Sequence, residues 1–305
     1  MRVVLKLEKV SGIEVFENVN IRNMTTFRIG GNAKVFVKIF TKKALKNFLK
    51  LSYEEGINYF ILGGGSNILV KDGDIDEFIV VKLDGEFKEV EFEEVNGKFK
   101  VRSGAGFSLP VLSKKALDNS LTGMEFCVAI PGSVGGAVIM NAGAHGYEIK
   151  DILRRVVVFS KTGEEIELKR EDIKFSYRSS GLDGLIVGMA EFELKKGDRI
   201  AISEKMEENL RYRANTQPKG FSAGSVFKNP EGAKAWKLIR DVGLAGYKIG
   251  DAMFSEKHAN FIINLGNARA EDVLKLMSLA RQRVFENFGI VLEPEVKLVG
   301  LLLEQ

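Results

Sequence analysis

Residues 130–143 have the sequence Ile-Pro-Gly-Ser-Val-Gly-Gly-Ala-Val-Ile-Met-Asn-Ala-Gly, which is denser in glycine than a simple turn requires. Residues 126–147 around it contain no Lys, Arg, Asp or Glu, and roughly 20 apolar residues are enough to cross a bilayer. Its glycines, with Pro131, Asn141 and His145, would leave backbone groups unpaired in lipid. We therefore expect a buried segment that wraps a ligand; the alternative, from the residues alone, is a tightly packed crossing of core segments.

A second glycine-rich segment, LGGGSNILV at residues 62–70, follows a short apolar run. Its glycines allow backbone N–H groups to approach an anion closely, and Ser66 and Asn67 can add side-chain donors. A plain tight turn is the alternative. The candidate cofactor-binding residues of the two segments are Gly63, Gly64, Gly65, Ser66, Asn67, Ile68, Pro131, Gly132, Ser133, Gly135, Gly136, Asn141 and Gly143.

The composition of the chain is that of a soluble globular protein. Of its 305 residues 45% are hydrophobic and 28% charged, and this length suggests about two domains. A net charge of +4 does not favour nucleic-acid binding, although it allows a local basic site for an anionic ligand. The single Cys127 excludes an intrachain disulfide and is expected as a small core residue. Residues 1–10 are unlike a signal peptide, so we expect a cytoplasmic protein with no membrane association.

Several common site patterns are missing from the sequence. There is no P-loop and no G-x-G-x-x-G fingerprint, so an ordinary Rossmann dinucleotide site is not expected. Ile68 stands where a nucleophile elbow requires glycine. The two histidines, His145 and His258, lack metal-ligand spacing, and we expect no metal site.

Hydrophobic periodicity and turn residues predict a mixed α+β chain. The region up to residue 83 reads as strand–helix–strand, the middle third is mostly β, and the last third shifts toward helix. Ser108 is expected to cap a helix that has Pro110 in its first turn. The expected strands are 35–40, 59–62, 78–83, 87–95, 98–102, 154–160, 165–168, 185–194, 261–265 and 291–300, and the expected helices are 42–55, 108–119, 200–213, 233–242 and 270–288.

Three further segments carry residues suited to an anionic substrate. Arg178, in FSYRS, could hold a carboxylate in a fork, although a surface ion pair is the commoner role of a lone Arg. Ser225 lies in SAGSVFKNP, followed by Lys228 and Asn229 as anion and amide donors; the alternative is a turn leading into a strand. Glu295, in LEPEV, is expected inside an apolar strand, and the alternative is a solvent-facing edge position.

Taken in order, these segments resemble one family along the whole chain, the UDP-N-acetylenolpyruvoylglucosamine reductases (UDP-N-acetylmuramate dehydrogenases, the MurB family). The matching stretches are NMTTFRIGG from Asn23, LGGGSN, IPGSVGGAVIMNAGAHG, YRSS, QP, AGSVFKNP, the run from Trp236 to Ala268, and LEPEV. The short spacing between Arg178 and Ser225 resembles the shorter form of the family, which lacks an inserted loop with a substrate-contacting Tyr. No such Tyr is therefore carried over.

The resemblance implies an α+β protein with a two-lobe FAD-binding fold of the vanillyl-alcohol-oxidase (PCMH) type and a third, α+β substrate-binding domain. We expect the first FAD-binding lobe at residues 1–83, joined by a C-terminal strand at 296–305. The second lobe is expected at 84–196, and the substrate-binding domain at 197–295. A monomer is expected, with small-molecule partners only and no nucleic acid.

The resemblance also implies the reaction. Non-covalently bound FAD takes hydride from NADPH and delivers it to the enolpyruvyl ether of a UDP-sugar, in peptidoglycan synthesis. Ser225 is the implied proton donor, and Arg178 and Glu295 are implied to stabilise the anionic intermediate. Such a carboxylate beside an anion requires protonation or a bridge to Arg178. The implied substrate-binding residues are Tyr177, Arg213, Lys228 and Asn229.

Two other functions are weighed against this one. A different flavin oxidase or dehydrogenase on the same fold is disfavoured by the SAGSVFKNP and LEPEV segments. A non-catalytic protein that binds a UDP-sugar or nucleotide is disfavoured because Ser225, Arg178 and Glu295 occur together.

Overall fold

The computed structural model describes residues 2–303, which divide into two compact units. Unit 1 comprises residues 2–17, 35–64 and 78–213, and unit 2 comprises residues 18–34, 65–77 and 214–303. Each unit is described by itself below. The chain enters and leaves unit 2 more than once, so residues distant in sequence share each core.

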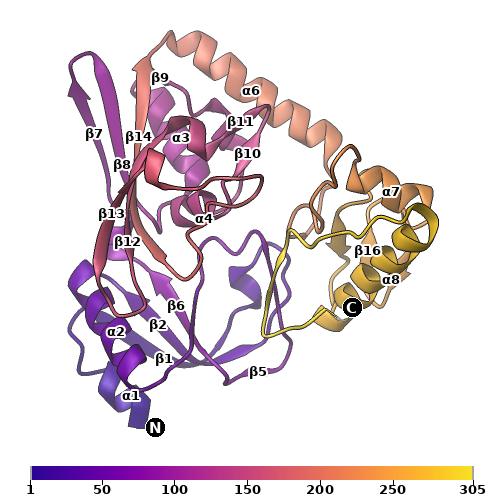
Figure 1. Ribbon diagram of the computed structural model, residues 1–305, viewed down its shortest axis with the longest axis horizontal. Coiled ribbons are helices and arrows are strands. Elements are labelled where there is room, and N and C mark those ends of the chain that lie inside the picture. Colours follow the sequence, from indigo (N-terminus) through magenta and orange to yellow (C-terminus); the bar gives the residue numbers. More distant parts are fainter. Residues whose placement is uncertain (1, 304–305) are drawn as a thin grey trace. The chain divides into compact units, whose positions relative to one another are not determined.

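A five-stranded antiparallel sheet with the order β13-β12-β14-β8-β7 forms the larger part of unit 1, and β9 pairs with the end of β14. Figure 1 shows these strands side by side with α3 and α4 on one face. The strands are β7 (Val90–Val95), β8 (Lys98–Gly104), β9 (Leu121–Thr122), β12 (Leu153–Phe159), β13 (Glu165–Lys169) and β14 (Ile186–Lys196). The helices and short pairs around them are α3 (Leu109–Asp118), η3 (Glu125–Ala129), α4 (Val134–Ile139), β10 (Gly143–Ala144), β11 (Tyr147–Glu148), α5 (Ile149–Ile152), η4 (Arg170–Asp172) and α6 (Arg199–Thr216).

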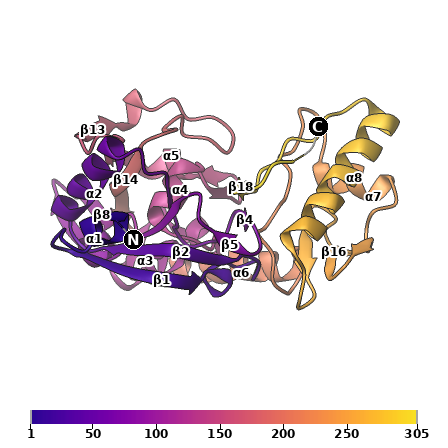
Figure 2. The ribbon, with the colours of Figure 1, turned by 90° about the horizontal axis from the view of Figure 1, so that it is seen from below.

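A second sheet has the strand order β1-β2-β6-β3, with β5 also paired to β2, and the division between the two units falls within β1 and β2. Figure 2 shows β1 and β2 side by side. In unit 1, Phe36–Ile39 of β2 pair in parallel with β6, which pairs in parallel with β3. The elements are α1 (Arg2–Leu7), β1 (Ile13–Asn20), β2 (Asn32–Ile39), α2 (Lys42–Glu54), β3 (Tyr59–Ile61), β6 (Ile79–Leu83) and η2 (Gly85–Lys88).

The two sheets of unit 1 share one apolar core. Helix α2 begins at the N-cap Thr41, whose side chain accepts from Ala44 N at 3.1 Å, and it buries the face containing Leu45, Phe48 and Leu49. These residues join a cluster that includes Val81 of β6 and apolar residues of α3, α4, β12 and β14. Burying side chains of this size is worth about 1.5–3 kcal/mol each, so this core holds the loops between the strands in place.

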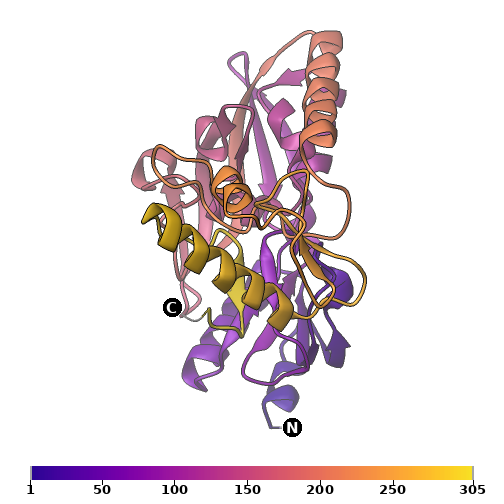
Figure 3. The ribbon, with the colours of Figure 1, turned by 90° about the vertical axis from the view of Figure 1, so that its right-hand side faces the viewer.

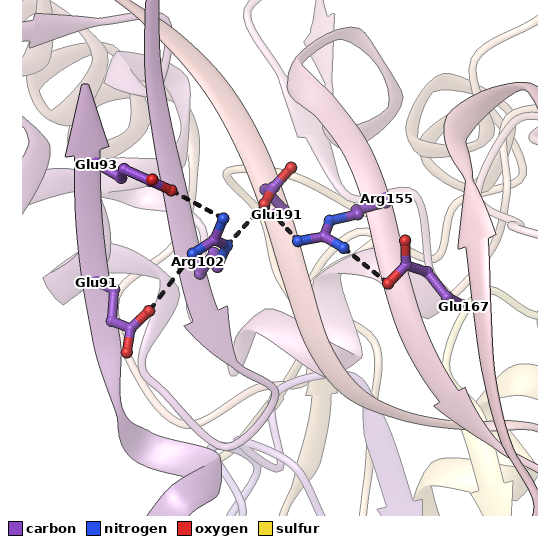
Figure 4. A network of polar contacts seen from close by, with 6 residues as sticks. All are labelled: Glu91, Glu93, Arg102, Arg155, Glu167 and Glu191. Atoms are coloured by element: carbon purple, nitrogen blue, oxygen red, sulfur yellow. Dashed lines mark hydrogen bonds and ion pairs between the residues drawn. The ribbon is translucent and has the colours of Figure 1, made fainter. Parts of the chain in front are cut away.

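The outer face of the antiparallel sheet has a row of charges across its strands (Figure 4). Glu191 of β14 is 4% exposed and accepts from Arg102 Nε of β8 at 2.8 Å and Arg155 Nη2 of β12 at 2.9 Å. Arg102 also pairs with Glu93, and Arg155 with Glu167. The strand register places Arg102 and Arg155 directly opposite Glu191, one on each side.

Unit 2 is built around α8 (Ala270–Phe288), the long helix shown in yellow in Figure 3. It packs on α7 and on the short sheet β15-β16-β17, and it ends at Gly289, whose φ of +67° is the left-handed C-cap conformation. Its buried face, which includes Val273, Leu276 and Val284, forms a core with Phe227 and other residues of the unit. The elements are η1 (Arg22–Met24), β4 (Ile68–Val70), β5 (Asp74–Ile75), α7 (Ala235–Asp241), β15 (Lys248–Ile249), β16 (Ala252–Phe254), β17 (Ile262–Asn264) and β18 (Lys297–Val299).

Three sequence predictions need correction. The strand expected at 291–300 is wrong in extent, since only Lys297–Val299 forms β18, which pairs in parallel with β4 (Figure 2). Pro294 lacks an N–H, and the residues before β18 form an isolated bridge, Phe227–Pro294, in place of a continuous strand. The first part of the strand expected at 87–95 belongs to η2. Ser108 is the N-cap of α3, but its side chain makes no capping hydrogen bond.

Candidate functional site

The two glycine-rich segments meet in unit 1 through their backbones. A Cβ on Gly64 would lie 2.5 Å from the Cα of Gly132, and a Cβ on Gly63 would lie 2.7 Å from Oγ of Ser133. Real Cβ atoms do not approach backbone so closely, so glycine is required at Gly64, whereas a side chain at Gly63 would displace the Ser133 hydroxyl. Ser133 caps α4 by accepting from Gly136 N. The predicted cofactor segments, far apart in sequence, thus form one surface of closely packed backbone.

Further glycines of the second segment serve the same close packing. A Cβ on Gly135 would lie 2.8 Å from the Cβ of Ala105, and the Gly135 N–H donates to Ala105 O at 2.8 Å. Gly136 and Pro131, in contrast, are exposed. The segment is therefore anchored on one side and open on the other, as a backbone surface for a flat ligand must be.

The remainder of the first segment belongs to unit 2. A Cβ on Gly65 would lie 2.9 Å from the Cα of Thr25, and Gly65 O accepts from Thr26 N at 3.0 Å. Asn67 Nδ2 donates to Glu295 O at 3.1 Å, and Asn67 O accepts from Lys297 N. Asn67 and Glu295, two predicted site residues far apart in the sequence, are therefore in direct contact.

Arg178 lies at the tip of a tight turn in unit 1. Ser176 and Ser179 exchange both backbone hydrogen bonds, at 2.9 and 3.2 Å, and Tyr177 and Arg178 span the turn between them. Arg178 has a φ of +58°, a conformation that a non-glycine residue adopts only at a cost of about 1–2 kcal/mol. Its Nη2 donates to Gly143 O at 3.4 Å, and its guanidinium stacks over the Tyr177 ring.

The Ser225 segment of unit 2 runs between two other segments. On one side Ser225 bridges Phe261, and on the other Val226 O accepts from Glu295 N at 2.8 Å. Ser225 and Glu295 thus lie on neighbouring extended segments, each half-buried. The structure brings these two predicted catalytic residues together at the level of the backbone.

The predicted substrate-binding residues are held by protein partners. Lys228 Nζ lies 3.3 Å from Glu293 Oε2, and Asn229 Oδ1 accepts from Ala235 N at the start of α7. Arg213, on α6, donates through Nη1 to Ala129 O, which joins α6 to the residues just before the glycine-rich segment. Burial lowers the pKa of Arg213.

The predicted site residues divide between the units. Unit 1 contains Gly63, Gly64, the residues of the second glycine-rich segment, Tyr177, Arg178 and Arg213. Unit 2 contains Gly65–Ile68, Ser225, Lys228, Asn229 and Glu295.

One buried residue close to Ser225, Asn260, was not predicted from the sequence. Asn260 is 3% exposed, and its side chain binds both backbone polar groups of Phe227. An Asn inside an apolar run is the only trace of this role in the sequence. Cys127 is buried as predicted, and burial, with the nearby carboxylate of Glu125, raises its pKa well above the usual range. None of the helices within residues 2–303 has the length and apolar character needed to span a bilayer.

Comparison with known proteins agrees with this geometry. Residues 33–169 match the family described as "FAD binding domain", and residues 217–299 match "UDP-N-acetylenolpyruvoylglucosamine reductase, C-terminal domain". The chain is 45% identical over 299 residues to the UDP-N-acetylenolpyruvoylglucosamine reductase of Caldicellulosiruptor bescii, covering 96% of this chain and 93% of the relative. It is 41% identical to that of Clostridium novyi, covering 94% and 92%.

A solved structure shows the same family similarity. The reductase (MurB) from Thermus caldophilus superposes with a TM-score of 0.79 at 38% identity, covering 94% of this chain and 98% of that one. The predicted α+β fold with an FAD-binding domain is confirmed. The chain belongs to the UDP-N-acetylenolpyruvoylglucosamine reductase family.

Proposed function

We propose that this chain reduces the enolpyruvyl ether of UDP-N-acetylglucosamine to UDP-N-acetylmuramate in peptidoglycan synthesis, with NADPH as the reductant and FAD as the cofactor. The end-to-end similarity to reductases of this name supports the reaction. The observation that carries it to particular residues is the pairing of the Ser225 segment with the Glu295 segment.

The residues proposed to hold FAD are those of the two glycine-rich segments. Gly64 packs so closely on the backbone of Gly132 that no side chain fits there, Gly63 lies against Oγ of Ser133, and Gly136 remains exposed. This arrangement fits a flat, anionic cofactor laid against backbone N–H groups. When bound, FAD supplies the hydride chemistry that links NADPH to the enolpyruvyl group.

Arg178 is proposed to bind the carboxylate of the enolpyruvyl group. Its turn is held by both Ser176–Ser179 hydrogen bonds, and its guanidinium is oriented by Gly143 O and the Tyr177 ring. As hydride reaches the terminal vinyl carbon, negative charge spreads into that carboxylate, so a fixed guanidinium binds the transition state better than the substrate. Glu295 is proposed to stabilise the same charge as a neutral donor.

Ser225 is proposed to deliver the proton to the carbon beside the carboxylate. The half-buried hydroxyl follows Gly224, whose φ of +81° permits the bend that brings the chain into the Val226–Glu295 pairing. A serine is a weak acid, so this role requires a neighbouring proton source, and Glu295 is on the adjoining segment.

The lobe boundaries and the remaining site roles are also proposals. We propose FAD-binding lobes at 1–83 and 84–196, with 296–305 joined to the first, and a substrate-binding domain at 197–295. The parallel pairing of β18 with β4 supports the return of the C-terminus to the first lobe. Tyr177, Arg213, Lys228 and Asn229 are proposed to contact substrate, the last two near the UDP phosphates. We propose a monomer that acts in the cytoplasm.

The reaction is tested by its product. Protein incubated without air with NADPH and the enolpyruvyl UDP-sugar should convert the sugar to a product heavier by two hydrogens in mass spectrometry. With deuterated water as solvent, deuterium should appear at the carbon beside the carboxylate, because the proton proposed to come through Ser225 exchanges with water. Acid precipitation should release all of the flavin to the supernatant, because FAD is proposed to be non-covalent. Oxidation of NADPH with an unchanged sugar would contradict the proposal.

A further inference from the structure

Asn141, immediately after α4, has a backbone conformation that asparagine or glycine can adopt. Its φ is +42°, Asn141 N donates to Val138 O at 3.1 Å, and Ala142 N donates to Ala137 O at 2.8 Å. This is the hydrogen-bond pattern that ends a helix with a left-handed residue, for which glycine is the usual choice and asparagine the second. The backbone therefore does not explain why a side chain is present here.

The side chain of Asn141 is 0% exposed, and its amide is used by the protein. Nδ2 donates to Ser176 O and to Glu148 Oε2, both at 3.0 Å, and Oδ1 accepts from Lys150 N at 3.1 Å. A primary amide has only two N–H groups, and both are directed at protein acceptors. This use distinguishes Asn141 from Gly64 and Gly136, two exposed residues that were also predicted from the sequence to bind the cofactor.

One of these hydrogen bonds holds the base of the Arg178 turn. Ser176, whose carbonyl accepts from Asn141, exchanges both backbone hydrogen bonds with Ser179. Just beyond the turn, Ser180 N donates to Ile139 O of α4 at 3.1 Å. The turn is thus attached on both sides to the end of α4, and Arg178 between these attachments is kept at a φ of +58°.

The other hydrogen bond reaches Arg178 from its opposite end. Glu148, which accepts from Asn141, pairs with Gly143 across the two short strands β10 and β11 (Figure 1). Gly143 O in turn accepts from Arg178 Nη2. Asn141 therefore closes a ring of hydrogen bonds in which the backbone of Arg178 is held through Ser176 and its guanidinium through Gly143.

We propose that Asn141 is a positioning residue that fixes both the turn and the guanidinium direction of Arg178 for the substrate carboxylate. This inference rests on the role of Arg178 in the proposed function. An amide is required because the two acceptors, Ser176 O and the Glu148 carboxylate, both need a donor from one buried atom. Aspartate has nearly the same shape but would place a third acceptor between them.

Two variants separate this role from that of the backbone. Asn141→Gly keeps the left-handed conformation and removes only the side chain, so the protein is expected to fold. Asn141→Asp keeps the acceptor for Lys150 N but loses both donated hydrogen bonds. Ser113→Ala is the matched control, since it removes another buried hydrogen bond in unit 1, from Oγ to Met124 O at 2.7 Å.

The decisive test is a double-mutant cycle on flavin reoxidation by the enolpyruvyl UDP-sugar, with FAD-loaded protein. Asn141→Gly should slow reoxidation by roughly 10–100-fold, because a displacement of about 1 Å at a positioning group can cost about 10²-fold. In the Arg178→Ala background the same change should cause no further loss, since two residues that act as one unit are not additive. The control Ser113→Ala should leave the rate unchanged.

A second measurement does not depend on activity. Hydrogen exchange of the amides of Ser176 and Ser179 should become faster in Asn141→Gly, whereas FAD affinity should not change. Equal losses in both backgrounds, or a fall in FAD affinity with unchanged exchange, would overturn the inference in favour of a direct cofactor contact. If the flavin of Arg178→Ala were reoxidised at the wild-type rate, the proposed role of Arg178 would be wrong. If reoxidation were slow in Arg178→Ala but as fast as wild type in Asn141→Gly, only the inference about Asn141 would be overturned.

Discussion

Asn260 binds the backbone of Phe227 at both of its polar groups: Oδ1 accepts from Phe227 N at 3.0 Å, and Nδ2 donates to Phe227 O at 2.8 Å. The side-chain amide thereby takes the place of a strand partner. In addition, Asn260 O accepts from Val226 N at 2.8 Å. One residue thus fixes the chain between Ser225 and Lys228, both of which are proposed site residues.

This pairing predicts that Asn260→Asp destabilises unit 2. Aspartate would direct an acceptor at Phe227 O, and a buried polar group left without a partner costs about 1–3 kcal/mol. We expect the free energy of unfolding in urea to fall by an amount in this range. Asn267→Ala, at an exposed position nearby, is the control and should have almost no effect. Equal stability of Asn260→Asp and wild type would show that the two hydrogen bonds contribute nothing.

The charged row of Figure 4 predicts a pH dependence of stability. Burial acts to raise the pKa of Glu191, but hydrogen bonds from Arg155 and Arg102 outweigh it and hold this pKa below its usual range. A lowered folded pKa stabilises the protein above the unfolded value of about 4.3, and this contribution is lost as pH falls toward the folded value. The contribution of Glu191 should therefore be constant from about pH 7 to about pH 5 and decline below about pH 4.

Glu191→Gln is the variant that measures this contribution. Breaking a buried pair costs about 3–5 kcal/mol, but Arg102 and Arg155 keep Glu93 and Glu167 as partners, so we expect a smaller loss at neutral pH. The difference in unfolding free energy between wild type and Glu191→Gln should shrink as the pH falls below about 4. A difference that does not change between neutral and acid pH would contradict the assigned charge of Glu191.

Ser225→Ala should separate the two halves of the reaction. Flavin reduction by NADPH needs no proton from Ser225 and should remain near the wild-type rate. Reoxidation by the enolpyruvyl UDP-sugar should fall by about 10²–10⁴, the usual loss when a positioned acid is removed. Stopped-flow absorbance of the flavin measures both rates. Equal slowing of the two would mean that Ser225 shapes the site without donating a proton.

Glu295 should act on the intermediate more than on the bound substrate. If it works as a neutral donor, Glu295→Gln retains a donor and should be milder than Glu295→Ala. Both variants should slow reoxidation and leave the Kd of the substrate for the oxidised protein nearly unchanged, since an interaction made only in the transition state affects turnover and not binding. A pure rise in Kd would assign Glu295 to binding, and wild-type rates in Glu295→Ala would remove it from the catalytic set.

The sequence correctly predicted those helices and strands whose bounds are set by their own residues. Helix α8 has the predicted bounds because its apolar period and Gly289 are both visible in the sequence. The strand expected at 291–300 was predicted too long. Pro294 interrupts it, and the backbone groups of residues 293–296 pair with the segment around Val226. A helical or strand period cannot report a partner so distant in sequence.

The same distinction applies to the candidate site. Glycine density identified both loops, but not that Gly64 packs directly on Gly132, which depends on the fold of unit 1. Asn141 was predicted as a cofactor-binding residue, and its bonds to Glu148 and Ser176 are visible only in the structure. Side-chain bonds to a distant backbone have no periodic trace in a sequence, so the supporting roles of Asn141 and Asn260 could not be predicted.

Stopped-flow spectroscopy of the FAD-loaded protein, in two successive mixes without air, tests the central claim most directly. NADPH should bleach the flavin absorbance in the first mix. The enolpyruvyl UDP-sugar should restore it in the second, with UDP-N-acetylmuramate formed in equal amount to the flavin reoxidised. A flavin that NADPH reduces but that stays reduced in the presence of this sugar would contradict the account.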